Sequence, residues 1–382
     1  MKIAQFSSFG KPDEVIDCIE VNDLEDPKGN EVLIDILACP INPADLLNIE
    51  SKYGVKAKLP ARLGAESVGK VKKVGSSVKG FKEGDIVLPL DGENWVQQKL
   101  IDEKNLILLP DNIDPIQLSM LKVNPATAYL MLKKYVKLNE GDWIIQDAAN
   151  SGVGQCLIRL AKMDGIKTIN IVRRKELEKE LLEIGADIVI EDSENMPLDI
   201  KKLTNDADIK LAIDAVGGDI VLRLGDCLAE KATILNYGLL SGKNIEMTSY
   251  QTVFKRLILT GFWLMPWRQS MKKEELVDMY NYLASLIASK KLYVPIEKTY
   301  SLDEIKASDD IYEAFAIRFD KWAKSKGVLK DEDPSLRHLV KTMVLGCGYS
   351  VSAGKFALIS GMDEEEAVKA VKLYRTKMKR VV

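Results

Sequence analysis

The chain has 382 residues, enough for two or three domains with a large buried core. Its formal net charge of −3 gives no general attraction to nucleic acid or to anionic membranes. The single histidine, His338, lies near the C-terminal end, which excludes a Ser-His-Asp triad and a His-rich metal site from the rest of the chain.

The cysteine pattern and the length of the apolar runs indicate the cellular compartment. Five cysteines are scattered along the chain without a C-x-x-C pair, which favours a reducing environment over a disulfide framework or a zinc knuckle. The first residues carry no signal-peptide pattern, and no apolar run reaches the ~20 residues that span a bilayer. We therefore expect a cytoplasmic protein that does not bind membranes.

Short strands separated by Gly and Asp/Asn clusters make up roughly the first 115 residues. The expected strands are Glu31–Ala38, Ser67–Val74 and Asp85–Leu90. The pattern predicts an all-β, barrel-like module.

From about residue 120 helices and strands alternate. The pattern predicts helices over 125–135, 153–164 and 175–184, and strands over 143–147, 167–172, 187–190, 211–214 and 232–237. Strands that alternate with helices are typical of a doubly wound parallel sheet. The fold class is therefore α/β.

The turn between the strand at 143–147 and the next helix lies where a dinucleotide-binding turn lies in a doubly wound domain. Small residues lead into a helix whose N-terminal amides can face a pyrophosphate. As a glycine motif the turn is weak, because Ala149 and Ser151 replace the first two glycines of G-x-G-x-x-G and only Gly154 keeps its place. The alternative is an ordinary turn between a strand and a helix.

The end of the following strand carries Arg173 and Arg174. An enzyme that uses NAD places an Asp or Glu here for the ribose 2′-hydroxyl, and this acid would repel a 2′-phosphate. Guanidinium groups bind such a phosphate through charge-assisted hydrogen bonds. We therefore expect NADPH as cofactor, unless the arginines are an ordinary surface pair.

Three local patterns resemble the medium-chain dehydrogenase/reductase superfamily: Asn42-Pro43-Ala44-Asp45, Gly64-Ala65-Glu66 and A-x-x-G-V-G. Metal-dependent members place a zinc-binding Cys and His where this chain has Asn42 and Ala65. The resemblance therefore implies a GroES-like β-rich catalytic domain without metal, followed by a Rossmann domain. It leaves mainly quinone reductases and 2-enoyl thioester reductases.

Three further motifs resemble the enoyl thioester reductases of type II and mitochondrial fatty acid synthesis: Val123–Tyr129, Asn150–Gln155 and Gly261-Phe262-Trp263-Leu264-x-x-Trp267. The match departs at Asp147, where the family usually has Asn. It implies reduction of trans-2-enoyl thioesters of coenzyme A or acyl-carrier protein by a homodimer. An NADPH:quinone reductase is the alternative.

The resemblance also assigns roles to residues. Tyr53 falls on the catalytic tyrosine, which holds the thioester oxygen or assists protonation of the α-carbon; the other interpretation is packing at the barrel edge. Trp263 and Trp267 line the substrate pocket or are core aromatics. The cofactor positions are Asn124, Asn150, Ser151, Gly152, Val153, Gly154, Arg173, Arg174, Tyr237, Gly238, Leu239, Leu240, Phe262, Trp263 and Leu264.

The resemblance covers residues 1–306 and implies a catalytic domain over 1–119 and 265–306, with the Rossmann domain over 120–264. Residues 307–382 instead resemble a fragment of the fingers region of family A DNA polymerases, on the spacing of Arg337, Lys341 and Tyr349. We expect this segment to be a helical appendage. Its balanced charges make nucleic acid an unfavoured partner, and a non-catalytic nucleotide- or nucleic-acid-binding fusion remains the alternative.

Overall fold

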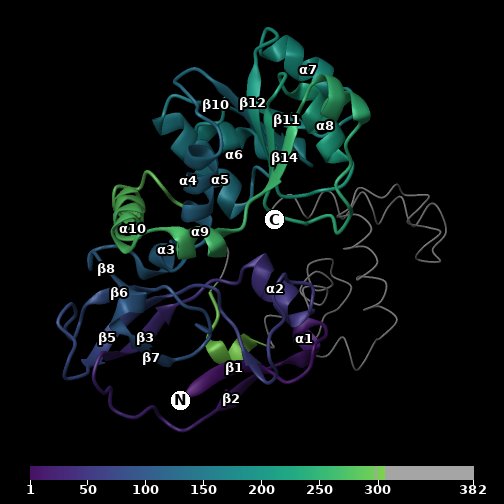
Figure 1. Cartoon of the computed structure of the whole chain (residues 1–382). Coiled ribbons are helices and arrows are strands. Elements are labelled where there is room, and N and C mark those ends of the chain that lie inside the picture. Colours follow the sequence, from purple (N-terminus) through teal and green to yellow (C-terminus); the bar gives the residue numbers. More distant parts are fainter. Residues whose placement is uncertain (297–298, 306–382) are drawn as a thin grey trace, which may run out of the picture. The chain divides into compact units, whose positions relative to one another are not determined.

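The computed structural model describes residues 1–296 and 299–305, which form two compact units. The larger unit contains Met1, Asn22–Asp45 and residues 63–296. The smaller unit contains Lys2–Val21, Leu46–Arg62 and residues 299–305. Figure 1 labels their helices and strands. The expectations for residues 307–382 lie outside the described residues.

A six-stranded parallel sheet forms the second half of the larger unit (Figure 1). Between β9 and β12 the strand order changes direction, which is the topological switch point of a doubly wound sheet. The expected α/β fold with a parallel sheet is confirmed. In spatial order the strands are β11 (Ile188–Glu191), β10 (Lys167–Val172), β9 (Trp143–Gln146), β12 (Ile209–Asp214), β13 (Thr233–Asn236) and β14 (Ile258–Gly261).

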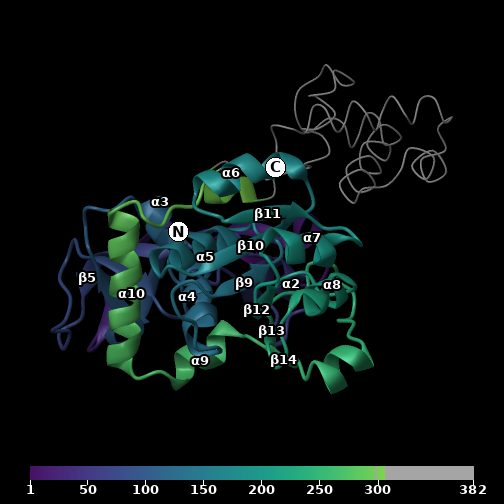
Figure 2. The ribbon, with the colours of Figure 1, turned by 90° about the horizontal axis from the view of Figure 1, so that it is seen from above.

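Helices cover both faces of this sheet (Figure 2). Successive residues of a strand point to opposite faces. Ile144 therefore packs in the core that includes α4 (Asn124–Lys134) and α5 (Gly152–Met163). Ile145 packs in the core on the other face, together with residues of two further helices. These are α7 (Met196–Leu203) and α8 (Ile220–Cys227).

The first half of the larger unit contains an antiparallel five-stranded sheet. Val68 and Leu88 join the same core as residues of α4 and α5, so this sheet and the parallel sheet share one core. A short helix, α3 (Pro115–Ser119), and a long one, α10 (Lys273–Ala288), contribute to that core. In spatial order the strands are β7 (Gln98–Asp102), β3 (Glu31–Ala38), β5 (Val68–Val74), β6 (Ile86–Pro89) and β8 (Leu106–Leu109).

The smaller unit contains a three-stranded antiparallel sheet in the order β2-β1-β4. Its strands are β2 (Ile16–Glu20), β1 (Lys2–Phe6) and β4 (Ala61–Arg62). The strands of the first 115 residues are therefore divided between two sheets, whereas the sequence predicted one barrel-like module. The difference arises because β1 pairs with β4, a partner that no local pattern identifies.

Three further short elements lie close in sequence to predicted site residues. The expected helix at 175–184 is divided into a 3₁₀ turn, η2 (Lys175–Leu177), and α6 (Glu178–Glu183). α2 (Pro43–Ile49) precedes Tyr53. No described helix has both the length and the low polarity needed to cross a membrane.

Candidate functional site

The turn after β9 is shaped by two local features. Ala148 has a φ of 44°, in the left-handed region, which reverses the chain directly after the strand. Ser151 is the N-cap of α5, and its hydroxyl accepts a hydrogen bond from the amide of Gly154 at 3.1 Å. The turn therefore brings the N-terminus of α5 to the carboxyl edge of the sheet.

Gly154 is required by close packing in this turn. A Cβ atom at this position would lie 2.5 Å from the carbonyl oxygen of Ala149. Among the described residues, no group accepts a hydrogen bond from the amides of Gly152 and Val153. Free amides at a helix N-terminus are donors for an anion, so the turn fits the pyrophosphate of a dinucleotide.

Asn124, at the start of α4, lies beside this turn. A Cβ atom on Gly152 would be only 2.7 Å from the Nδ2 atom of Asn124. The structure thus brings together two cofactor residues that the sequence placed on separate segments. The next predicted residues, Arg173 and Arg174, follow β10, which pairs with β9. Arg173 is exposed and Arg174 is half-buried.

The loop after β13 carries the next predicted cofactor residues, Tyr237–Leu240. The Nδ2 atom of Asn236 donates to the carbonyl oxygen of Gly238 at 2.8 Å, which holds the loop against the strand end. A Cβ atom on Gly238 would lie 2.5 Å from the carbonyl oxygen of Ala215. Leu239 and Leu240 are about half exposed. This loop and the turn after β9 follow strands that flank β12.

The segment after β14 brings aromatic residues to the same sheet. The amide of Phe262 donates to the carbonyl oxygen of Asn236 at 2.8 Å, and Phe262 is buried. Trp263 is the N-cap of α9 (Leu264–Ser270) and is 40% exposed. The Nε1 atom of Trp267 donates to the hydroxyl of Tyr135 at 2.8 Å. Trp267 therefore packs in an aromatic cluster, and its contact with substrate stays a prediction.

A buried polar network that the sequence did not predict holds the start of α4. Glu66 is fully buried, and its carboxylate accepts hydrogen bonds from Asn42 at 3.0 Å and from the amide of Val123 at 2.7 Å. Burial raises the pKa of Glu66 and lowers the pKa of Lys122. Because Val123 is the N-cap of α4, Glu66 fixes the residue next to Asn124.

The positions of zinc ligands in related enzymes have other partners here. Asn42 donates to Glu66, and the amide of Ala65 donates to Asp45 at 2.9 Å. Burial is the main cause that raises the pKa of Asp45 to about 6. In the part of the chain that the structure describes, no three His, Cys, Asp or Glu side chains are grouped to hold a metal ion.

Tyr53 belongs to the smaller unit. Its amide donates to the carbonyl oxygen of Leu47 at 3.2 Å, so the chain turns back on α2 immediately before it. The side chain is half-buried. The catalytic role of Tyr53 stays a prediction.

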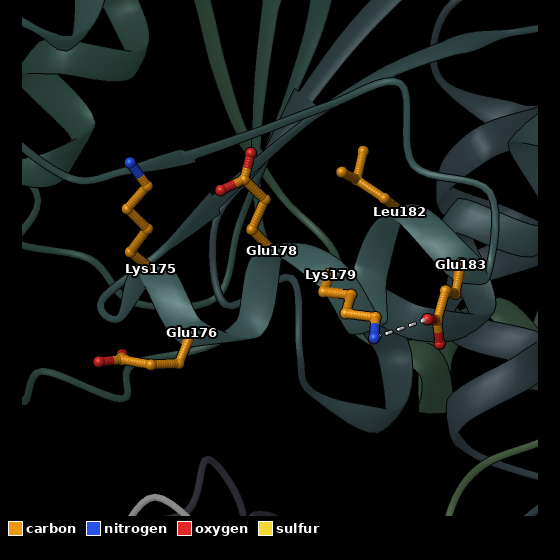
Figure 3. A pocket seen from close by; sticks show the side chains of 6 residues that line it. All are labelled: Lys175, Glu176, Glu178, Lys179, Leu182 and Glu183. Atoms are coloured by element: carbon orange, nitrogen blue, oxygen red, sulfur yellow. Dashed lines mark ion pairs between the residues drawn. The ribbon is translucent and has the colours of Figure 1, made fainter. Parts of the chain in front are cut away.

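A surface hollow lies along η2 and α6, directly after Arg174 in sequence (Figure 3). Within it, Lys179 and Glu183 form an ion pair at 3.9 Å. None of its lining residues was predicted to bind the cofactor. It is lined by Lys175, Glu176, Glu178, Lys179, Leu182 and Glu183.

The comparisons with known proteins agree with the fold and show the family. The family model described as alcohol dehydrogenase GroES-like domain matches residues 28–104, and the one described as zinc-binding dehydrogenase matches residues 152–281. The chain is 37% identical over 302 residues to a mitochondrial enoyl-[acyl-carrier-protein] reductase of Dictyostelium discoideum. That match covers 77% of this chain and 86% of the relative.

Solved structures of two kinds of enzyme are similar to this chain. The complex of Etr1p with NADP and crotonyl-CoA has a TM-score of 0.72 and 28% identity, and the match covers 79% of this chain and 94% of that chain. The Escherichia coli quinone oxidoreductase complexed with NADPH has a TM-score of 0.73 and 28% identity, with 81% and 95% coverage.

The expected cytoplasmic location is wrong on this comparison, because the curated relatives are named mitochondrial. The reason is physical as well as biological. Import machinery recognises a targeting signal, so the composition and cysteine content of the folded body do not report the compartment.

Proposed function

The chain belongs to the enoyl-[acyl-carrier-protein] reductase family, and we propose that it reduces the C2=C3 bond of trans-2-enoyl thioesters with NADPH. The product is a saturated acyl thioester. The observation that carries this proposal is the 37% identity over 302 residues to a mitochondrial enoyl-[acyl-carrier-protein] reductase. The fold is equally similar to a quinone oxidoreductase and does not by itself separate the two activities.

Residues of the larger unit bind the cofactor in this proposal. The amides of Gly152 and Val153 bind the pyrophosphate, and Arg173 and Arg174 hold the 2′-phosphate. Asn124, Tyr237–Leu240 and Phe262–Leu264 surround the remaining part of the dinucleotide. NADPH supplies a hydride to the β-carbon of the enoyl thioester.

Tyr53 serves the substrate. An enolate-like charge develops on the thioester oxygen during reduction, and a hydrogen-bond donor next to that oxygen stabilises it. A phenol is such a donor at neutral pH and does not need histidine. Tyr53 holds the oxygen or assists protonation of the α-carbon, while Trp263 and Trp267 contact the acyl group.

The proposed domain boundaries differ from the two compact units, because the proposed catalytic domain also includes the described residues of the smaller unit. Residues 1–119 and 265–306 are the GroES-like catalytic domain, and residues 120–264 are the Rossmann domain. The position of α10 supports the return of the chain to the first domain. Leu276 and Tyr280 of α10 are buried in the core that also contains residues of β8. In addition, the hydroxyl of Tyr280 donates to the carbonyl oxygen of Lys122 at 3.0 Å.

A homodimer is supported by the edge of the parallel sheet. β14 is the last strand of that sheet, and Ile258 and Leu259 are 54% and 42% exposed. An apolar edge strand favours pairing with a second copy. Replacing Ile258 and Leu259 with Lys should shift the protein to monomer in sedimentation velocity. Leu198→Lys, an exposed site on α7, is the control and should leave the dimer intact.

The activity test follows the loss of NADPH absorbance with crotonyl-CoA and, at the same enzyme concentration, with a quinone. Faster oxidation with crotonyl-CoA supports the proposal, and oxidation by the quinone alone supports the quinone reductase alternative. A crotonyl-acyl-carrier-protein arm identifies the preferred carrier. Exhaustive chelation should leave the rate unchanged, and a loss that zinc reverses would contradict a metal-free mechanism.

A further inference from the structure

Two carboxyl groups meet at the switch point of the parallel sheet. Asp147 directly follows β9, and Asp214 is the last residue of β12, the strand paired with it. Both residues are at most 1% exposed. A pair of ionised carboxylates in such a buried place would be strongly unfavourable.

The hydrogen bonds of the pair are unequal. Asp214 accepts three: from the amides of Val216 and Gly217 on Oδ1, at 2.9 and 2.8 Å, and from Asn236 on Oδ2 at 2.6 Å. Asp147 accepts one on Oδ1, from the amide of Ala215 at 2.7 Å. Its Oδ2 has no donor among the described residues. Both oxygens of Asp214 therefore have donors, and Oδ2 of Asp147 is the position left for a proton.

The surroundings of the two carboxyl groups also favour a proton on Asp147. Burial raises the pKa of Asp147 well above its usual range, and the hydrogen-bonding contact with Asp214 raises it further. No described Lys or Arg pairs with either carboxyl group. Two other titratable groups lie nearby, Tyr237 after β13 and Cys156 of α5, and burial raises the pKa of each. Both stay neutral at pH 7, so neither compensates a second negative charge.

We propose that Asp147 keeps a proton at neutral pH, donates it from Oδ2 to Asp214, and thereby positions the two loops that bind NADPH. This inference rests on the proposed function. Asp147 leads into the turn that ends at Val153. Asp214 is bonded to Asn236, whose amide also holds Gly238 in the loop after β13. The shared proton therefore joins both loops across three adjacent strand ends.

Loss of the proton has two consequences. The two carboxylates repel each other, which separates the loops, and an additional negative charge lies behind the turn that binds the pyrophosphate. The affinity for NADPH should therefore be highest at neutral pH and should decrease as the pH rises through the pKa of Asp147. The stability of the folded protein should decrease as the pH rises from the pKa of an unfolded Asp, about 4, up to the raised pKa of Asp147, because over this interval only the folded state keeps the proton.

The test compares the unmodified protein with Asp147→Asn. The amide of Asn can donate to Asp214 as the acid does, but it cannot ionise. NADPH dissociation constants are measured by fluorescence titration from about pH 7 to about pH 10, together with the Tm of the protein without cofactor. Asp208→Asn, an exposed position before β12, is the matched control.

We expect the NADPH dissociation constant of the unmodified protein and of the Asp208→Asn control to rise about tenfold or more over this range. Their Tm should fall until the pH reaches the pKa of Asp147 and then level off with respect to this group. Asp147→Asn should show a much flatter profile in both measurements. Identical profiles for all three proteins would overturn the inference. Absence of NADPH binding at every pH in every protein would instead contradict the proposed function.

A second measurement needs no variant. Infrared spectroscopy of the unmodified protein at neutral pH should show the carbonyl band of a protonated, buried carboxylic acid, and part of this band should persist above the pKa of Glu66, about 7, and disappear only in stronger alkali. Absence of this band at neutral pH would overturn the inference even if Asp147→Asn does not fold.

Discussion

At the scale of single residues, Arg173 and Arg174 are the residues that we propose to select NADPH. They follow β10, at the position where an acid would bind the ribose of NAD. We predict that replacing both with Ala weakens NADPH binding about tenfold or more, because two charge-assisted contacts to the 2′-phosphate are lost. NADH binding should change little. Isothermal titration calorimetry with both cofactors measures the two affinities.

The control for this prediction is Lys179→Ala, an exposed lysine on the neighbouring α6. This substitution removes a positive charge close in sequence to the two arginines, and it should leave the NADPH affinity unchanged. Equal affinities for NADPH and NADH in the unmodified protein would show that the arginines do not recognise the phosphate.

Tyr53 is the second residue whose role can be tested alone. We predict that Tyr53→Phe lowers kcat with crotonyl-CoA by about 10²–10⁴, the usual effect of a lost donor or acid. NADPH binding should be unaffected, because the ring is retained. Tyr250→Phe, at an exposed tyrosine, provides the control in the same steady-state assay. Full activity of Tyr53→Phe would mean that the tyrosine only packs.

At the scale of secondary-structure elements, the junction of β9 and α5 depends on Gly154. We predict that Gly154→Ala destabilises the protein by about 1–3 kcal/mol, because the added Cβ overlaps backbone that cannot move aside. The two carbonyl oxygens in its way belong to Ala149 and Ala148, at 2.5 and 2.8 Å. Urea unfolding gives the free energy, and an NADPH titration should show weaker binding.

Gly80→Ala is the matched control for this substitution. Its Cβ would meet only the Oε2 atom of Glu103, at an ordinary 3.8 Å. The control should unfold at the same urea concentration as the unmodified protein. If the Gly154→Ala variant were as stable as the unmodified protein, the turn could widen to accept a Cβ atom. The close approach of α5 to β9 would then not require glycine.

At the scale of the whole molecule, the question is whether the segment after residue 306 takes part in catalysis. Every residue assigned to cofactor or substrate lies before it. We predict that a chain ending at residue 330 keeps its kcat and KM for crotonyl-CoA, because it retains the complete set of binding residues. Steady-state kinetics with both chains measures this, and circular dichroism checks that the shorter chain is folded.

A folded but inactive shorter chain would show that the segment contributes to the reductase. Tight binding of primer-template DNA by the full chain in physiological salt would instead support a nucleic-acid-binding role. Either result would change the assignment of residues 307–382 as a passive appendage.

Much of the fold could be predicted because it is encoded locally. The expected strands at 31–38 and 167–172 are β3 and β10 with the same bounds, since their alternating or continuous apolar pattern is a property of consecutive residues. The turn after β9 was identified in the same way, from small residues between a strand and a helix. Such a pattern implies the two roles that the structure shows: Ser151 is the N-cap of α5, and Gly154 allows the helix to pack closely against the backbone of Ala149.

The buried networks could not be predicted in this way. Glu66 reaches the amide of Val123 across 57 positions of sequence, and Asp147 reaches the amide of Ala215 across 68. A carboxylate at the end of a predicted strand, as at Asp214, was the available signal for the second network. Its partner depended on which strands become neighbours.

The sequence by itself therefore determined the α/β class, the dinucleotide turn, the preference for a 2′-phosphate and the family. These properties depend on residue type and local spacing. The tertiary structure alone decided that β9 lies beside β12, which buries Asp147 against Asp214 and places Asn236 next to both. The physical reason is that burial and hydrogen-bond partners depend on long-range packing between segments, and these surroundings set the protonation of a carboxyl group.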